Sequence, residues 1–85
     1  MEVTYSKKAK EDIAFWKNSG NKKLMAKISE LISAMELYPF EGIGKPELLK
    51  HNLSGCWSRR INQEHRIVYE VTENKILVHS LKGHY

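Results

Sequence analysis

The sequence predicts an α+β fold in which an antiparallel β-sheet carries an N-terminal pair of helices on one face, in the order β-α-α-β-β-β. Three observations favour it: alternating residues at the N-terminus, two stretches of helical spacing, and three apolar runs with short connections in the C-terminal third. The 85 residues leave room for one domain, 1–85, because two cores would not fit.

The N-terminal half contains one strand and two helices. Residues 1–5 alternate between apolar and polar side chains, which is the period of a half-buried strand. Ser6 offers an N-cap for a helix over residues 7 to about 18, and Gly20 provides a C-terminal stop. A second helix begins near residue 21 and ends before Pro39, because the residue before a proline avoids the helical region. Its apolar stripe consists of Leu24, Ile28, Leu31, Ile32 and Met35.

The stretch "PFEGIGKPELLKHNLSG", residues 39–55, predicts mainly an ordered loop. It contains both prolines and several glycines, and it has no sustained period. Loops held by a scaffold often carry the chemistry of a protein. Strands are then expected over residues 56–61, 65–72 and 75 to about 82, and their short connections favour antiparallel hairpins.

Alternation along these strands predicts which side chains share a face, since neighbours in a strand point to opposite sides. The core side of the first two strands is expected to hold Trp57, Ile61, Ile67, Tyr69 and Val71. In the last strand, alternation places Leu77, His79 and Leu81 on one face. The other face then holds Ile76, Val78, Ser80 and Lys82.

The uncovered face then carries Arg60, Arg66 and Lys82, with His84 continuing the same parity. Such a face suits an anion, because Arg holds phosphate through a planar fork of donors. A solvated sheet face is an equally good interpretation from alternation alone.

Composition points to a soluble chain with an anionic partner. The net charge is +4 and the pI is about 9.3, which favours nucleic acid, although a well-solvated basic surface has the same composition. A single cysteine excludes an intrachain disulfide and suits a reducing compartment. No stretch is apolar over the roughly 20 residues that span a bilayer. We therefore expect a cytoplasmic protein without a membrane partner.

No metal or cofactor site is predicted. The four histidines and Cys56 lack the close paired spacing of a structural zinc site. The "GIGKPE" segment lacks the strand, glycine loop and helix context of a nucleotide-binding loop. Cys56 with a histidine has the composition of a nucleophile pair, but a small apolar residue in a strand is the simpler interpretation.

If the anion is RNA, the chain has the groups for metal-free cleavage. Attack of a 2′-hydroxyl on the adjacent phosphate needs a base, positive charge on the phosphate, and an acid for the departing 5′ oxygen. Glu47 offers the base, and Arg66 with Arg60 offers the charge. His84 offers the acid, because its reference pKa of about 6.5 suits proton transfer near neutrality.

The stretch "PFEGIGKPELLKHNLSGCWSRRINQEHRIVYEV", with the terminal "HY", closely resembles the YoeB or Txe group of toxin ribonucleases. These are mRNA interferases of type II toxin-antitoxin systems within the RelE-like superfamily. The resemblance implies a RelE-like, microbial ribonuclease-like fold and a ribosome-dependent endoribonuclease that cuts translated mRNA at the A site and so inhibits translation. It also implies a cognate antitoxin of the YefM or Axe type, with a homodimer as a further partner.

The resemblance also implies roles for individual residues. By position, Glu47 in "GKPE" matches the general base, His84 in "HY" the general acid, and Arg66 in "EHR" the arginine that stabilises the phosphate. The residues that match phosphate- or nucleobase-holding positions are Lys50, Arg60 and Tyr85.

Two positions before "HY" depart from the family pattern. Lys82 supplies a point charge where the family more often has an aromatic or arginine-bearing run. We expect Gly83 to loosen His84, because glycine has more backbone freedom than other residues.

Two other classes of function use the same basic face. One is a non-catalytic module that blocks translation by occupying RNA or the ribosome, with an affinity that falls steeply with salt. The other is a complex-forming protein whose face only docks an acidic antitoxin segment. If the chain is a toxin ribonuclease or a complex-forming protein, we expect an acidic, initially disordered tail of the antitoxin to fold onto this basic face.

Overall fold

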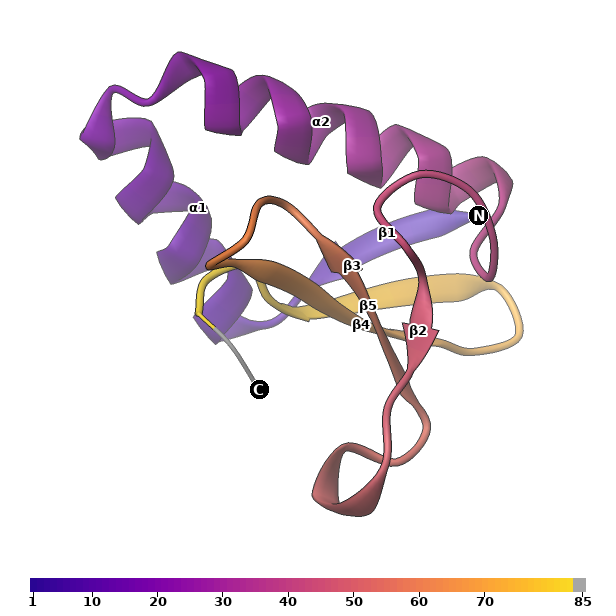
Figure 1. The fold of residues 1–85 in the computed structure, drawn as a ribbon. Coiled ribbons are helices and arrows are strands. Elements are labelled where there is room, and N and C mark those ends of the chain that lie inside the picture. Colours follow the sequence, from indigo (N-terminus) through magenta and orange to yellow (C-terminus); the bar gives the residue numbers. More distant parts are fainter. Residues whose placement is uncertain (84–85) are drawn as a thin grey trace.

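The chain folds in the predicted order, with one additional short strand. The computed structural model describes residues 1–83 and contains two α-helices and a five-stranded mixed sheet (Figure 1). The elements are β1 (Glu2–Tyr5), α1 (Lys7–Ser19), α2 (Lys22–Leu37), β2 (Glu47–Leu48), the 3₁₀ turn η1 (His51–Leu53), β3 (Cys56–Arg60), β4 (Arg66–Val71) and β5 (Lys75–Ser80). The predicted α+β class is confirmed.

Local capping signals set the bounds of both helices. The Ser6 side chain accepts a hydrogen bond from the Ala9 amide at 3.0 Å, and Gly20 ends α1 in the left-handed conformation with φ 74°. Asn21 caps α2 in the same way, accepting from the Leu24 amide at 3.0 Å. The predicted cap at Ser6, the predicted stop at Gly20 and the predicted end of α2 before Pro39 are confirmed, whereas the Asn21 cap was not predicted.

The sheet has the order β1-β5-β4-β3-β2. Strands β2, β3, β4 and β5 pair antiparallel, which confirms the predicted hairpins. The sequence did not predict two features of the sheet. The N-terminal strand β1 lies parallel to β5, and part of the predicted loop forms β2, where Glu47 pairs with Ser58.

Both helices lie on the same side of the sheet, and Figure 1 shows α2 running across it. The core between them contains Ala9, Trp16, Leu24, Ile28, Leu31, Met35, Ile61, Ile67, Tyr69, Ile76, Val78 and Leu81. The predicted stripe of α2 and the predicted core side of β4 are therefore confirmed. Within residues 1–83, no helix covers the opposite face of the sheet, which we call the open face.

The predicted faces of β5 are wrong. Ile76 and Val78 are fully buried in the core, although the alternation set them apart from Leu81, which is buried there too. The cause is a β-bulge: Tyr69 pairs with Val78, but the preceding residue of β4 pairs with Ser80, so one residue of β5 is extra. The bulge returns Ser80 to the open face and Leu81 to the core.

Neither of the two helices in residues 1–83 combines the length and the apolar character that crossing a membrane requires.

Candidate functional site

Three of the predicted site residues share the open face of the sheet. Glu47 pairs with Ser58, two positions before Arg60 on β3, and Arg60 in turn pairs directly with Arg66 on β4. Directly paired residues of antiparallel strands point to the same side, so the register aligns the carboxylate and the two guanidinium groups on one surface. This surface faces away from the helices.

The Arg66 side chain is held by the turn that precedes it. Its Nη1 donates to the carbonyl oxygens of Asn62 at 2.7 Å, Gln63 at 3.2 Å and His65 at 3.2 Å. Three backbone acceptors around one nitrogen fix the plane of the guanidinium group. A fixed plane favours the two-pronged binding of a phosphate, because little side-chain freedom remains to be lost.

The other predicted residues lie around this surface or beyond it. Lys50 is exposed at the start of η1. Lys82 is exposed beyond the end of β5, and its Nζ lies over the Phe15 ring of α1, 4.1 Å from the centroid. His84 and Tyr85 lie outside the described residues, so their predicted roles stay predictions.

The residues that lead to the C-terminus are anchored by hydrogen bonds. The Gly83 amide donates to His65 Nδ1 at 2.9 Å, and the Gly83 carbonyl accepts from the Arg66 amide at 3.2 Å. Gly83 adopts φ 92°, a conformation that suits glycine. Gly83 is therefore held at both its amide and its carbonyl, while the expectation that it loosens His84 concerns a residue outside the described part of the chain and stays a prediction.

Helix α1 holds Leu81, two positions before Gly83, by two buried contacts. The Asp12 carboxylate accepts from the Leu81 amide at 2.9 Å, and the Trp16 indole nitrogen donates to the Leu81 carbonyl at 2.9 Å. Lys8 pairs with Asp12 at 2.7 Å and neutralises its charge. Asp12 was not among the predicted residues, although an acid on the apolar side of a helix is a signal, since a buried charge needs a partner.

Arg59 is the second residue that the sequence analysis missed. It is fully buried, its Nε donates to the Tyr69 hydroxyl at 3.0 Å, and that hydroxyl donates to the Pro39 carbonyl at 2.8 Å. Its Nη atoms donate to the carbonyls of Tyr38, Glu41 and Ile43. Arg59 therefore shapes the segment that leads into β2 and Glu47. Its signal was its place between the core residues Trp57 and Ile61, because a buried Arg requires acceptors.

A cavity of about 330 Å³ lies on the open face. Its lining includes Cys56, Val68, Glu70, His79, Ser80 and Lys82. Burial raises the pKa of the Cys56 thiol above 9.0, and the nearby Glu70 charge raises it further. The thiol is thus protonated at neutral pH, which makes it a poor nucleophile and disfavours the Cys-His nucleophile pair.

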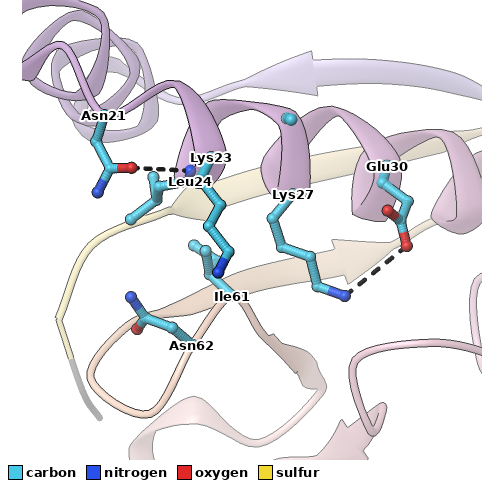
Figure 2. Close-up of a pocket in the computed structure, with 8 residues that line it drawn as sticks. Asn21, Lys23, Leu24, Lys27, Glu30, Ile61 and Asn62 are labelled. Atoms are coloured by element: carbon cyan, nitrogen blue, oxygen red, sulfur yellow. Dashed lines mark hydrogen bonds and ion pairs between the residues drawn. The ribbon is translucent and has the colours of Figure 1, made fainter.

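A larger cavity of about 590 Å³ lies between the start of α2 and the turn after β3 (Figure 2). Its lining includes Lys23, Lys27, Ile61 and Asn62, and Lys27 is 3.8 Å from the Glu30 carboxylate. None of the predicted site residues in the described chain lines it. The open face, where Glu47, Arg60 and Arg66 lie together, is therefore the candidate site.

Two helices on one face of a five-stranded mixed sheet are the α+β fold of RelE-like toxins. A solved structure described as a YoeB/ParE toxin from Agrobacterium tumefaciens has a TM-score of 0.94 with 37% identity, covering 100% of both chains. Residues 5–85 match the family model of the YoeB-like toxin of bacterial type II toxin-antitoxin systems. The chain belongs to the YoeB-like toxin family.

Two further relatives support this membership. Toxin YoeB of Escherichia coli strain K12 is 47% identical over 85 residues, which is the full length of both chains. The Staphylococcus aureus YoeB has been solved as a heterotetrameric complex with YefM and as a dimer. Each of these structures is 46% identical to the chain, covers 100% of it and 98% of the relative, and has a TM-score of 0.88.

Proposed function

We propose that residues 1–85 form a toxin endoribonuclease domain that cleaves translated mRNA at the ribosomal A site and thereby inhibits translation. The observation that carries the proposal is the register that brings Glu47, Arg60 and Arg66 onto one open face of a YoeB-family fold. A base and two phosphate-binding groups on neighbouring strands are what cleavage by an internal hydroxyl needs. Each of them also matches its family role by position.

The proposed reaction is a metal-free transfer of the phosphodiester. Glu47 takes the proton of the 2′-hydroxyl as the new bond from O2′ to phosphorus forms. Arg66 and Arg60 stabilise the added negative charge on the phosphate. His84 gives a proton to the 5′ oxygen as the bond from phosphorus to O5′ breaks. The products are a 2′,3′-cyclic phosphate and a 5′-hydroxyl, and Lys50, Lys82 and Tyr85 are assigned to holding the RNA.

The proposed protein partner is an antitoxin of the YefM type. An acidic segment of it would cover the basic face, and the net charge of +4 supports such a contact. Large apolar side chains are exposed at the end of α2 and in the segment through β2, namely Leu37, Tyr38, Phe40, Ile43 and Leu48. Apolar groups of this kind suit a protein contact, and we expect the antitoxin or a homodimer to cover them. A reducing cytoplasm suits the single thiol.

The test uses programmed ribosomes incubated with the wild type, Glu47→Ala and His84→Ala. We expect the wild type to leave a 5′-hydroxyl end in the A-site codon, and each variant to cleave at least about 100-fold more slowly, the usual loss on removing one acid or base. Glu73→Ala is the matched control, because Glu73 is exposed in the turn between β4 and β5 and has no proposed role.

The same experiment separates cleavage from occupancy. Translation arrest without cut mRNA, surviving loss of Glu47 and His84 but not of Lys50 and Arg60, would replace the proposal with a binding module. Equal cleavage by the wild type, Glu47→Ala and His84→Ala would overturn the assigned roles.

A further inference from the structure

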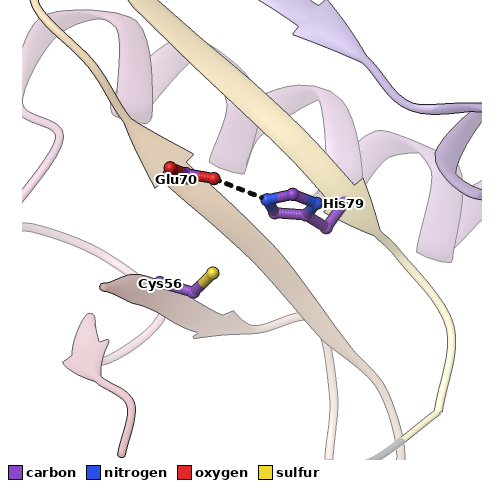
Figure 3. Close-up of side chains that lie close together, drawn as sticks. All are labelled: Cys56, Glu70 and His79. Carbon is purple, nitrogen blue, oxygen red and sulfur yellow. Dashed lines mark hydrogen bonds and ion pairs between the residues drawn. The ribbon is translucent and has the colours of Figure 1, made fainter. Parts of the chain in front are cut away.

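Three residues of different donor chemistry meet on the open face, outside the proposed catalytic set. Cys56 begins β3, Glu70 lies directly opposite it on β4, and His79 comes from β5 (Figure 3). They are far apart in the sequence, and the close ligand pairs of structural zinc sites are absent from their spacing. The fold brings them together, so this cluster was invisible to the sequence analysis.

The β-bulge is what delivers the histidine. Glu70 pairs with Leu77, and the register then shifts by one residue, so that His79 is the extra residue of β5. The His79 Nε2 lies 3.0 Å from the Glu70 Oε1, and Figure 3 shows the imidazole directed at the carboxylate. Bulges re-aim side chains at functional surfaces in this way.

The donor atoms are close enough for one metal ion. A sulfur of Cys56, an oxygen of Glu70 and a ring nitrogen of His79 all lie within 4.8 Å of one another. At bond lengths of about 2.0 Å to nitrogen and oxygen and about 2.3 Å to sulfur, tetrahedral ligands lie about 3.3 to 3.6 Å apart. The Glu70 to His79 separation of 3.0 Å is already near this value, and a bound ion would draw the Cys56 sulfur, which lies within 4.8 Å of both donors, into the same range.

The surroundings suit a bound cation with an open position. The cluster lines the cavity of about 330 Å³, which leaves space for a water as a fourth ligand. All three residues are half-buried, so the site is shielded without being closed. The Lys82 side chain also lines this cavity. Its ammonium group lies over the Phe15 ring of α1, 4.1 Å from the ring centroid.

We propose that Cys56, Glu70 and His79 form a binding site for a divalent transition metal, with Zn²⁺ as the ion that its mixed sulfur, nitrogen and oxygen donors favour. The site joins three adjacent strands at the centre of the open face. None of its three ligands belongs to the residues proposed for the cleavage reaction.

The test is calorimetric titration of Zn²⁺ into the reduced full-length chain, with Co²⁺ as a spectroscopic probe. We expect one ion per chain and, with Co²⁺, a thiolate-to-metal charge-transfer band. Cys56→Ser, Glu70→Gln and His79→Gln should each weaken Zn²⁺ binding at least about tenfold, because loss of even an outer-shell partner costs about 10- to 100-fold. Cys56→Ser should abolish the band.

His51→Asn and Glu73→Gln are the matched controls, since both residues are exposed and lie outside the cluster. A measurement on the unaltered chain removes any dependence on how the variants fold: Zn²⁺ should slow alkylation of the Cys56 thiol at least about tenfold. Alkylation that is equally fast with Zn²⁺, or Zn²⁺ affinity that is unchanged in Cys56→Ser, would overturn the proposal. Loss of binding in His51→Asn alone would place the ion elsewhere and would also overturn it.

Discussion

Arg59 and Arg60 are neighbours in the sequence but belong to different parts of the protein. Arg59 points into the core and donates to Tyr69 and to loop carbonyls, whereas Arg60 is exposed on the open face opposite Arg66. Strand alternation alone separates the two roles. A pair of adjacent arginines therefore contains one residue for the fold and one for the proposed RNA contact.

We predict that Arg59→Met lowers the free energy of unfolding by about 3 kcal/mol, because it leaves the Tyr69 hydroxyl and several carbonyls without their charged donor. Arg59→Lys should also destabilise, because an ammonium group cannot reproduce the fork of donors. Arg60→Met is the matched control, and we expect a change within about 0.5 kcal/mol at that exposed position. Urea unfolding measures all three, and equal stability of the Arg59 and Arg60 variants would contradict the assignment.

The same comparison shows how far the sequence predicts individual residues. Alternation correctly placed Arg60 and Arg66 on the open face, but it made no prediction for Arg59, because a charged side chain was not expected in the core. The acceptors that make Arg59 tolerable there are carbonyls 16 or more residues away along the chain. A contact of that kind is set by the tertiary fold, so no local pattern contains it.

At the scale of elements, the turn after β5 is defined by contacts at Leu81 and Gly83. Asp12 and Trp16 hold Leu81 from α1, and His65 and Arg66 hold Gly83 from the edge of β4. The proposed acid, His84, follows directly in the sequence. The positions of Leu81 and Gly83, which precede His84 in the sequence, are therefore fixed by α1 and by the start of β4.

We predict that Gly83→Ala reduces mRNA cleavage about 10- to 100-fold, because a small displacement of a catalytic group has effects of that size. The alanine methyl is strained at φ 92°, and relief of this strain shifts the peptide. Gly20→Ala is the matched control: it has φ 74° and equally open surroundings, but it ends α1. Both variants should lose about 1 to 2 kcal/mol of stability. Equal cleavage rates in the two variants would contradict the prediction.

The helices were predictable at this scale because their caps are local. Ser6, Gly20, Asn21 and Pro39 each act within a few residues of the helix end that they define. The bulge in β5 and the strand β2 depend on partners elsewhere in the sheet, and the alternation of residues 75–82 was misread for that reason. Two of the predicted catalytic residues, Glu47 and Arg66, were found from sequence and lie on one face, and their chemistry awaits the cleavage experiment.

At the scale of the whole molecule, Tyr69 joins the sheet to the segment before β2. Its ring is fully buried, and its hydroxyl accepts from Arg59 and donates to the Pro39 carbonyl. Burial raises the pKa of Tyr69 above 10.0, although the hydrogen bond and the charge of Arg59 act in the opposite direction. The folded state therefore keeps the phenolic proton at a pH where the unfolded chain has released it.

We predict that the stabilising contribution of Tyr69 is constant below pH about 10 and declines as the pH rises through the raised pKa of the folded state. The readout is the difference in unfolding free energy between the wild type and Tyr69→Phe, measured by urea unfolding across this pH range. Other titrating groups are common to both proteins and cancel in the difference. A difference that stays unchanged well above pH 10 would contradict the burial of an un-ionised phenol.

The position of β5 in the sheet also affects how the chain folds during its synthesis on the ribosome. Strand β5 is the last to be synthesised, yet it lies between β1 and β4. Until it has left the exit tunnel, β1 has no strand to pair with and the apolar stripes of both helices have no complete surface to cover. Closing a contact of such large sequence separation is slow compared with helix formation. A chain that has not yet been extended through β5 consequently lacks the central connection of its sheet.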